Sequence, residues 1–531
     1  MSVSRRDFLK LGAATASLAV LPPRLLGLRG AARAGALAAD PDRRALAMRA
    51  LDAATGSGAS YADVRLTHDW VRLFGEKDFG DIESMEVGVR ALVQGYWGFA
   101  SGPVWTPDEM ARLGREAVHQ AKTNALGKTR EVSLAPAPPV RDGSWVMPVD
   151  IDPFEISPLE VIDYLRSLGI FTAHVKHGAN VDLVEGTFSK QDKTFASSEG
   201  SYCTQRLYSG SGRLLLAFEK DRRKDSRQVD LLTVSSVGWE LFAKQPIREA
   251  IRSVIDAMEE DMKLPVKAVD VGRYDTVIDA RGVGTLLDET LGRATELDRA
   301  LGYEANAGGT SYINAPMDML GSYRAGAPVL AVTGNRSAAG GAATVKWDDE
   351  GVAPDDFTIV NDGVLADFQT TRESAHWLEP YYSRRNRPVR SHGCATADSA
   401  IDAPLQQPPN LVMRPGKDAR DFDALVAGLE NGIAIAGLGV DLDFQHLNGL
   451  GTGRIYEVKK GKKVAMLGGG GVLFRAPELW KGLYALGSSA SARRFGRCAQ
   501  KGEPAQAACH SVTAVPAAFK QLTLIDPQRK A

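Results

Sequence analysis

The sequence predicts an α+β protein in which N-terminal α/β units precede a largely β domain of barrel or sandwich type. Two regions, residues 42–128 and 157–264, combine helical periodicity with alternating strands. Beyond residue 298, short apolar runs separated by Gly, Pro and Asn recur about every 8–12 residues, which is typical of sandwiches and barrels. A chain of 531 residues exceeds single-domain size, so we expect two or three domains, each with a buried core.

Composition and charge exclude some classes of function. The chain is 44% hydrophobic and 24% charged, which is ordinary for a globular protein. Its net charge of −1 gives no indication of a surface for nucleic acid or for an anionic membrane. We therefore expect no nucleic-acid partner.

Residues 1–38 have the features of a twin-arginine signal peptide. Arg5 and Arg6 precede an apolar run at 11–21, which is shorter than the ~20 residues of a spanning helix. Small-x-small sites at 32–34 and 36–38 could be the cleavage point. The sequence therefore predicts export by the twin-arginine machinery to the periplasm, or another extracytoplasmic space of a bacterium; the alternative is a coincidental basic N-terminus.

The chain has four cysteines, and an exported protein meets an oxidising environment in which they could pair. Only Cys498 and Cys509 are close in sequence, so they form the simplest predicted disulfide. Together with His510 they could also be half of a metal site, but no second half with ligand spacing exists. Cys203 and Cys394 have no near neighbour.

The first predicted domain covers residues 40–130. A helix at 42–55 ends at a Gly-Ser-Gly sequence, a strand follows at 62–66, and Thr106 opens an amphipathic helix at 107–126. Between them, residues 86–101 form a predicted hairpin with glycine at the turn. Residues 88–100 of this hairpin have no acid and no Ser, Thr or Cys nucleophile, so we interpret the hairpin as scaffold.

Residues 130–148 are rich in proline and are predicted to be a linker. The second predicted domain, 149–265, contains helices at 157–177 and 238–264. Strands are predicted at 180–188 and 193–198 and within 208–238, with a turn at 198–201. We expect no active site in it.

The third predicted domain, 270–531, begins with a short buried strand at 276–279. Gly282 and Gly284 follow it, but a third glycine and a P-loop lysine are missing, so a phosphate-binding loop is not supported. Residues 286–298 then have helical spacing of leucines, with Glu289 and Arg293 four residues apart. An exposed pair of this kind contributes ~0.2–0.5 kcal/mol.

Several motifs give the chain a resemblance to the TldD/PmbA metallopeptidase family over most of residues 60–525. Residues 288–298 overlay H-E-x-x-x-H-x-x-E-x-D with Asp288 and Arg293 in place of the histidines. The resemblance is also carried by the following stretches: G-V-R-x-x-x-x-G-x-x-G-F-A at 88–100, the S-E-G turn at 198–200, D-D-E-G at 348–351, 359–365 and 409–416.

The resemblance implies a zinc site and also indicates how it is altered. In metal-bearing members two histidines and a C-terminal cysteine bind zinc, so Asp288, Arg293 and Cys498 take the metal-ligand positions and Glu289 the catalytic one. Arginine cannot be deprotonated in a protein, so Arg293 places a fixed positive charge where a cation would bind. We therefore predict a Glu289–Arg293 salt bridge and no bound metal.

Two hypotheses for function follow from the resemblance. The first is a metal-free peptide-binding or partner subunit of a proteolytic or peptide-maturation complex, as a homodimer or as a heterodimer with a family paralogue. The second is an active zinc peptidase whose ligands are Glu289, Cys498 and a distant histidine. An unrelated hydrolase is not supported, because G-x-S-x-G and H-E-x-x-H are absent.

Two other groups of residues are interpreted as structural. The acids at 348–350 lack the alternating spacing of a calcium cage, so we predict a solvated turn. No histidine of the third domain stands four residues from another, so each is predicted to be an ordinary histidine: His376, His392, His446 and His510.

Overall fold

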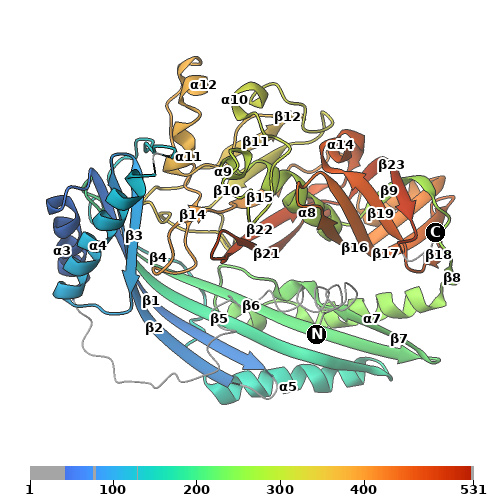
Figure 1. The fold of residues 1–531 in the computed structure, drawn as a ribbon. Coiled ribbons are helices and arrows are strands. Elements are labelled where there is room, and N and C mark those ends of the chain that lie inside the picture. Colours follow the sequence, from blue (N-terminus) through green and yellow to red (C-terminus); the bar gives the residue numbers. More distant parts are fainter. Residues whose placement is uncertain (1–41, 76–78, 128, 528–531) are drawn as a thin grey trace, which may run out of the picture.

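The computed structural model describes residues 42–75, 79–127 and 129–527 (Figure 1). The predicted signal peptide lies outside these residues. Within the described ranges, no helix combines the length and the apolar character that crossing a membrane requires. The predicted α+β class is confirmed, with a large sheet and its helices formed by the N-terminal half and a strand-rich C-terminal half (Figure 1).

The N-terminal half forms one sheet that, in the described residues, has seven strands in the order β3-β2-β1-β5-β6-β4, with β7 also on β6. Strands from both predicted N-terminal domains share it, because β1 pairs with β5 from Asp63–Ser197 to Gly75–Glu185. The strands are β1 (Tyr61–Gly75), β2 (Phe79–Val93), β3 (Tyr96–Gly102), β4 (Gly143–Val146), β5 (Ala179–Ser197), β6 (Tyr202–Lys220) and β7 (Arg223–Gln228).

Local sequence accounts for several of these elements. Gln94 and Gly95 have φ values of 52° and 81°, as a tight turn between β2 and β3 requires. Thr106 accepts a hydrogen bond from the Glu109 amide, and Ser157 accepts one from the Glu160 amide, so both cap helices that begin with proline. The helices of this half are α3 (Arg43–Gly56), α4 (Pro107–Ala125), α5 (Pro158–Val175), α6 (Glu240–Ala243) and α7 (Ile247–Lys263), with a 3₁₀ turn at Asp230–Leu232.

Two N-terminal predictions need correction. The helix predicted at 238–264 is two helices, α6 and α7, because Pro246 lies between them and cannot continue the hydrogen-bond ladder. The predicted linker is not wholly irregular, since β4 lies within it and pairs in parallel with β6.

The C-terminal half contains a closed barrel and a second sheet. Strands β9, β23, β19, β17 and β16 pair in that order, and β16 pairs back to β9, which closes the ring. The barrel strands and their extensions are β8 (Val266–Lys267), β9 (Gly272–Ile278), β16 (Asn431–Leu442), β17 (Asn448–Lys459), β18 (Lys462–Leu467), β19 (Gly471–Arg475), β20 (Leu483–Leu486) and β23 (Ala517–Ile525).

The second sheet has the order β12-β11-β10-β15-β22-β21, so β21 is at its edge. Its apolar face shares one core with the barrel, in which Leu287, Leu411 and Phe495 are buried. The strands are β10 (Val332–Asn335), β11 (Phe357–Asn361), β12 (Val364–Leu365), β15 (Asn410–Met413), β21 (Arg493–Lys501) and β22 (Gln506–Ala514), beside a small pair, β13 (Ala395–Thr396) and β14 (Leu405–Gln406).

The helix predicted at 286–298 is also corrected. Helix α8 (Ala280–Leu286) begins earlier, continues as a π-helical turn at Leu287–Gly292, and ends before α9 (Leu297–Ala300), because Glu296 adopts an extended backbone. The remaining short helices are α10 (Pro316–Met319), α11 (Arg372–His376), α12 (Glu379–Ser383), α13 (Phe422–Ala427) and α14 (Ala476–Leu479), with 3₁₀ turns at Trp480–Gly482 and Ser489–Ser491.

Candidate functional site

Helix α8 and its π-helical turn, residues 280–292, carry the start of the family motif and are called the motif helix below. This helix is fixed at its start by Asp279, which follows β9. One carboxylate oxygen of Asp279 accepts from the Gly282 amide at 2.7 Å, and the other accepts from the Gly437 amide at 2.8 Å. The helix then passes close to β21, because a Cβ at Gly284 would lie 2.4 Å from the Phe495 ring. The glycines after β9 therefore serve capping and close packing. The π-helical turn that follows is a geometry often found at functional sites.

Asp288 lies on this turn and is 3% exposed. Its carboxylate contacts His510 Nε2 at 2.7 Å and accepts from Arg497 Nε at 2.6 Å. Burial acts to raise the pKa of Asp288, but the charges of His510 and Arg497 outweigh it and hold the pKa well below its usual range. Both oxygens of this carboxylate are therefore engaged by groups from β21 and β22.

Glu289 is engaged in the same way. The predicted ion pair with Arg293 is present, with Arg293 Nε 2.6 Å from Oε2, and Arg497 Nη2 lies 2.5 Å from Oε1. Burial acts to lower the pKa of Arg293, but Glu289 and Asp288 raise it, so this cation stays charged. Arg497 thus bridges the two adjacent acids of the motif.

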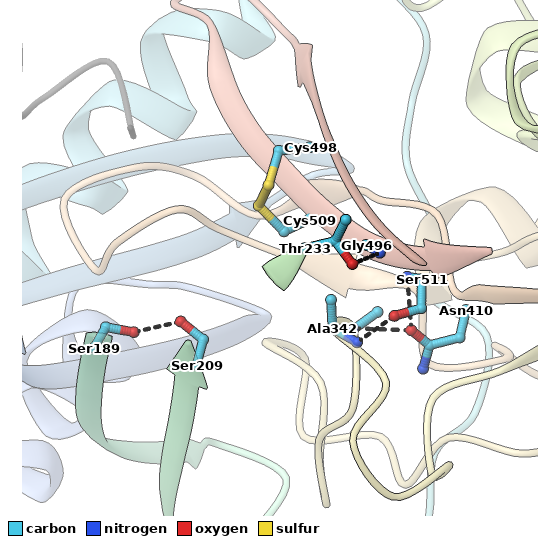
Figure 2. The surroundings of a disulfide bond; sticks show 10 residues. Ser189, Ser209, Thr233, Ala342, Asn410, Gly496, Cys498, Cys509 and Ser511 are labelled. Carbon is cyan, nitrogen blue, oxygen red and sulfur yellow. Dashed lines mark hydrogen bonds between the residues drawn. A yellow bond between two sulfur atoms is a disulfide. The ribbon is translucent and has the colours of Figure 1, made fainter. Parts of the chain in front are cut away.

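Cys498 lies on the other face of β21. Arg497, Ala499 and Lys501 share the opposite face, which is directed toward residues 288–298. Arg497 bonds to Asp288 and Lys501 to Glu296, and alternate residues of a strand share a face. Cys498 pairs with Cys509 of β22, and the predicted disulfide between them is present. Figure 2 shows this disulfide across the two strands, with Gly496 and Ser511 nearby. A disulfide sulfur offers no thiolate to a metal.

The face assignment bears on the third ligand position, which the resemblance places at Cys498. The neighbouring residue Ala499 shares the face of Arg497 and Lys501, whereas Cys498 is held in the disulfide on the other face. Ala499 lines a small cavity together with Asp288 and Arg293, as a third ligand position should. Ala499, and not Cys498, therefore faces Asp288 and Arg293, although Cys498 was the predicted ligand position.

A second group of charges lies beside the first. Lys501, 3% exposed, places Nζ 2.8 Å from both Glu296 Oε2 and Asp298 Oδ2. Arg299 Nε donates to Glu296 at 3.0 Å. Burial raises the pKa of Glu296, but Lys501 and Arg299 lower it to about 2, whereas burial raises the pKa of Asp298 to about 6 against the opposing effect of Lys501.

A small cavity opens between the motif helix and β21. It is partly open to solvent, and its enclosed part has room for about one water-sized group, such as a single oxygen atom. The two charge groups meet at its wall, since Asp288, Glu296 and Lys501 all line it. His510 of β22 also lines the cavity, as do Gln407 and Pro408 of the segment after β14.

The donors at this site do not fit a catalytic zinc ion. Zinc needs three protein ligands from neutral imidazole, thiolate or carboxylate, with a fourth position left for water. Here Arg293 takes one ligand position, Cys498 is held in a disulfide, and Asp288 is bonded to Arg497 and His510. Within the described ranges, no cluster of three or more His, Cys, Asp or Glu side chains is arranged to hold a metal.

Arg497 and Lys501 are site residues that were not predicted from the sequence, and His510 was interpreted as an ordinary histidine. The period-2 pattern of 495–501 was the available signal, because it places Arg497 and Lys501 on the face of Phe495. His510 carried no such signal. Its position follows from the pairing of Arg497 with His510 across β21 and β22.

The acids at 348–350 are buried, so the predicted solvated turn is wrong. Asp349 pairs with Lys193 at 2.5 Å, and Glu350 lies 3.5 Å from Arg90 and accepts from the Arg372 amide. Asp348 accepts from the Ala395 amide, and burial raises the pKa of Asp348 to about 7. The turn is charged because it joins the C-terminal half to cations of the large sheet.

Comparison with known proteins agrees with this architecture. Residues 271–512 match the PmbA/TldA metallopeptidase C-terminal domain. The chain is 23% identical over 388 residues to a metalloprotease of Methanocaldococcus jannaschii, covering 71% of this chain and 78% of that protein. It is 26% identical over 410 residues to a metalloprotease of Methanothermobacter thermautotrophicus, covering 71% and 76%.

Solved structures share the fold. TldE from Thermococcus kodakarensis superimposes with a TM-score of 0.64 at 13% identity, covering 89% of this chain and 98% of that one. A protein of Thermotoga maritima described as a candidate modulator of a DNA gyrase gives 0.67 at 14% identity, covering 90% and 99%. The fold and the motif helix thus define a metallopeptidase-like protein. The chain belongs to the TldD/PmbA metallopeptidase family.

Proposed function

We propose that this protein is a metal-free peptide-binding or partner subunit of a proteolytic or peptide-maturation complex outside the cytoplasm. The observation that carries the proposal is Arg497, whose guanidinium bridges Asp288 and Glu289 where the family pattern has a metal ligand and a catalytic acid. A divalent cation there would be opposed by Arg497 and Arg293 by several kcal/mol, even at an effective dielectric of ~20.

The edge of β21 supports peptide binding. The Gly496 amide donates to Thr233 Oγ1 and so points away from β22. In an antiparallel pair this direction recurs at every second residue, so Cys498 and Gln500 also direct their backbone groups outward. Thr233 and Val234 cover this edge at Gly496, whereas no described strand pairs with it at Cys498 and Gln500. An extended peptide could add to it through backbone hydrogen bonds alone, which requires no metal.

Metal analysis of the purified wild-type protein tests the proposal. After incubation with equimolar zinc and desalting, we expect far less than one equivalent of zinc, because each acid of the motif is held by a cation. As a positive control, Asp288→His, Arg293→His and Ala499→Cys would be combined with Arg497→Ala, and this variant should retain zinc. The matched control keeps Ala499, so only Cys498 could serve, and it should not retain zinc.

One equivalent of tightly held zinc in the wild-type protein, lost on Glu289→Gln, would refute the proposal. That result would instead support an active zinc peptidase with a rearranged ligand set. The partner is a second copy of this chain or a family paralogue, and size-exclusion chromatography with light scattering distinguishes a dimer from a monomer.

A further inference from the structure

The cavity beside the motif helix contains a buried amide without a partner. Gln407 is 3% exposed and lines the cavity. Its backbone amide donates to the Cys394 carbonyl at 2.7 Å, which fixes its position. Within the described part of the chain, neither Nε2 nor Oε1 of Gln407 has a hydrogen-bond partner. A buried amide left in this state costs about 1–3 kcal/mol, which a bound group that pairs with it would recover.

Two more residues of the cavity wall have the same property. Arg299 donates through Nε to Glu296 and through Nη1 to the Gly308 carbonyl, but no described residue accepts from Nη2. His510 contacts Asp288 through Nε2, whereas Nδ1 has no partner among the described residues. Arg299 and His510 are each 1% exposed. Unpartnered polar atoms thus occur on three side chains from separate segments around one cavity.

The unpartnered donors of the wall indicate what kind of ligand it can bind. Arg293, Arg299 and Lys501 line the cavity as cations, whereas Asp288 and Glu296 are its two carboxylates. Each of these carboxylates already has at least two basic partners, so neither is free to bind a cation. The unpartnered guanidinium nitrogen and the Gln407 amide nitrogen are donors. The cations of the wall are themselves paired with carboxylates, so the two unpartnered donors define the preference. They favour an acceptor group such as a carboxylate, which accepts two or more hydrogen bonds.

We propose that this cavity binds a peptide carboxylate, with the chain of the peptide leading from the edge of β21. This inference rests on the proposed peptide-binding function, because it names the group of the peptide that is recognised. Gln500 and Lys501 end β21 at the cavity. A peptide that pairs in parallel with β21 brings its C-terminal carboxylate there, whereas an acidic side chain could arrive in either direction.

Three peptides distinguish the sources of the carboxylate. The probes are N-terminally labelled tetra-alanine with a free C-terminus, the same peptide as its C-terminal amide, and the amide with aspartate at the third position. Fluorescence anisotropy should give at least about tenfold tighter binding of the free acid than of the plain amide, as expected for a hydrogen bond to a charged group. Tight binding of the aspartate peptide as well would assign recognition to any carboxylate, and not only to a C-terminus.

Variants of Gln407 test the site itself. Gln407→Leu should abolish the preference for the free acid, and Gln407→Glu, which adds a negative charge, should do so as well. Gln406→Leu is the matched control. Gln406 is equally buried, and its Nε2 likewise has no partner among the described residues, but its Oε1 accepts from Ser374 and it lies outside the cavity wall. Circular dichroism and the melting temperature would show that each variant is folded, and the Glu variant tests the site if the Leu variant does not fold.

The outcomes separate this inference from the proposed function. Equal binding of the free acid and the plain amide would overturn the carboxylate site and leave peptide binding intact. If no peptide binds, acetate is titrated and followed by saturation-transfer NMR. Acetate binding that depends on Gln407 would then retain the carboxylate site and refute peptide binding, whereas no acetate binding would overturn both.

Discussion

Replacing Lys501 by Met should strongly destabilise the C-terminal half. The ammonium group of Lys501 is buried and is 2.8 Å from both Glu296 and Asp298. Methionine keeps much of the volume but leaves Asp298 with only the Arg299 amide as a described donor. Removing one partner of a buried ion pair costs about 3–5 kcal/mol, because the remaining charge stays desolvated. At ~2–4 °C per kcal/mol for a domain of this size, the melting temperature should fall by at least about 6 °C.

Differential scanning calorimetry at neutral pH measures this change. Lys481→Met is the control, because the Lys481–Glu478 pair is largely exposed, and it should cost at most about 0.5 kcal/mol. Adding Asp298→Asn to Lys501→Met should recover part of the loss, since the uncompensated carboxylate is then neutral. If Lys501→Met shifts the melting temperature no more than Lys481→Met does, the buried charges are not coupled as the distances indicate.

Two further predictions concern pH and export. Burial acts to lower the pKa of His392, but hydrogen bonds to Asp355 and Asp367 raise it above 6.5. The contribution of His392 to the stability of the folded state is therefore full below pH 6.5 and is lost as pH rises through the raised pKa. Wild-type melting temperature should therefore fall between about pH 6 and about pH 9 by more than that of His392→Gln, and equal slopes would contradict this account. Changing Arg5 and Arg6 to Lys should leave precursor in the cytoplasm, and unchanged processing on fractionation would contradict the signal peptide.

Elements specified by local chemistry could be predicted from the sequence. The hairpin turn at Gln94 and Gly95 and the caps at Thr106 and Ser157 depend on residues within a few positions of one another. The ion pair between Glu289 and Arg293 is of the same kind, because helical spacing alone brings the side chains together. The family motifs then supplied the fold, whose closure depends on pairings such as β9 with β16 that are distant in sequence.

The sequence pattern alone did not show which side chains of β21 face the motif helix. Cys498 was the only sulfur near the expected ligand, yet a shift of one residue along a strand moves a side chain to the opposite face. The structure places Arg497 and Ala499 toward the motif helix and Cys498 away from it. The unpartnered atoms of Gln407 and Arg299 were also beyond prediction, because they depend on the packing of distant segments around one cavity.

The buried acids at 348–350 limit how the sequence of this protein can vary. Asp349 meets Lys193 of β5 on one side and the Ala397 amide on the other, and Glu350 is shared in the same way between Arg90 of β2 and the Arg372 amide. A neutral replacement of Asp349 would leave Lys193 in the large sheet without its acid and the Ala397 amide in the C-terminal half without its acceptor. Replacement of Glu350 would leave the Arg372 amide without its acceptor, whereas Arg90 would keep Asp63. Substitutions in one half are therefore tolerated here mainly when the other half changes with them, so the two halves are expected to have diverged together.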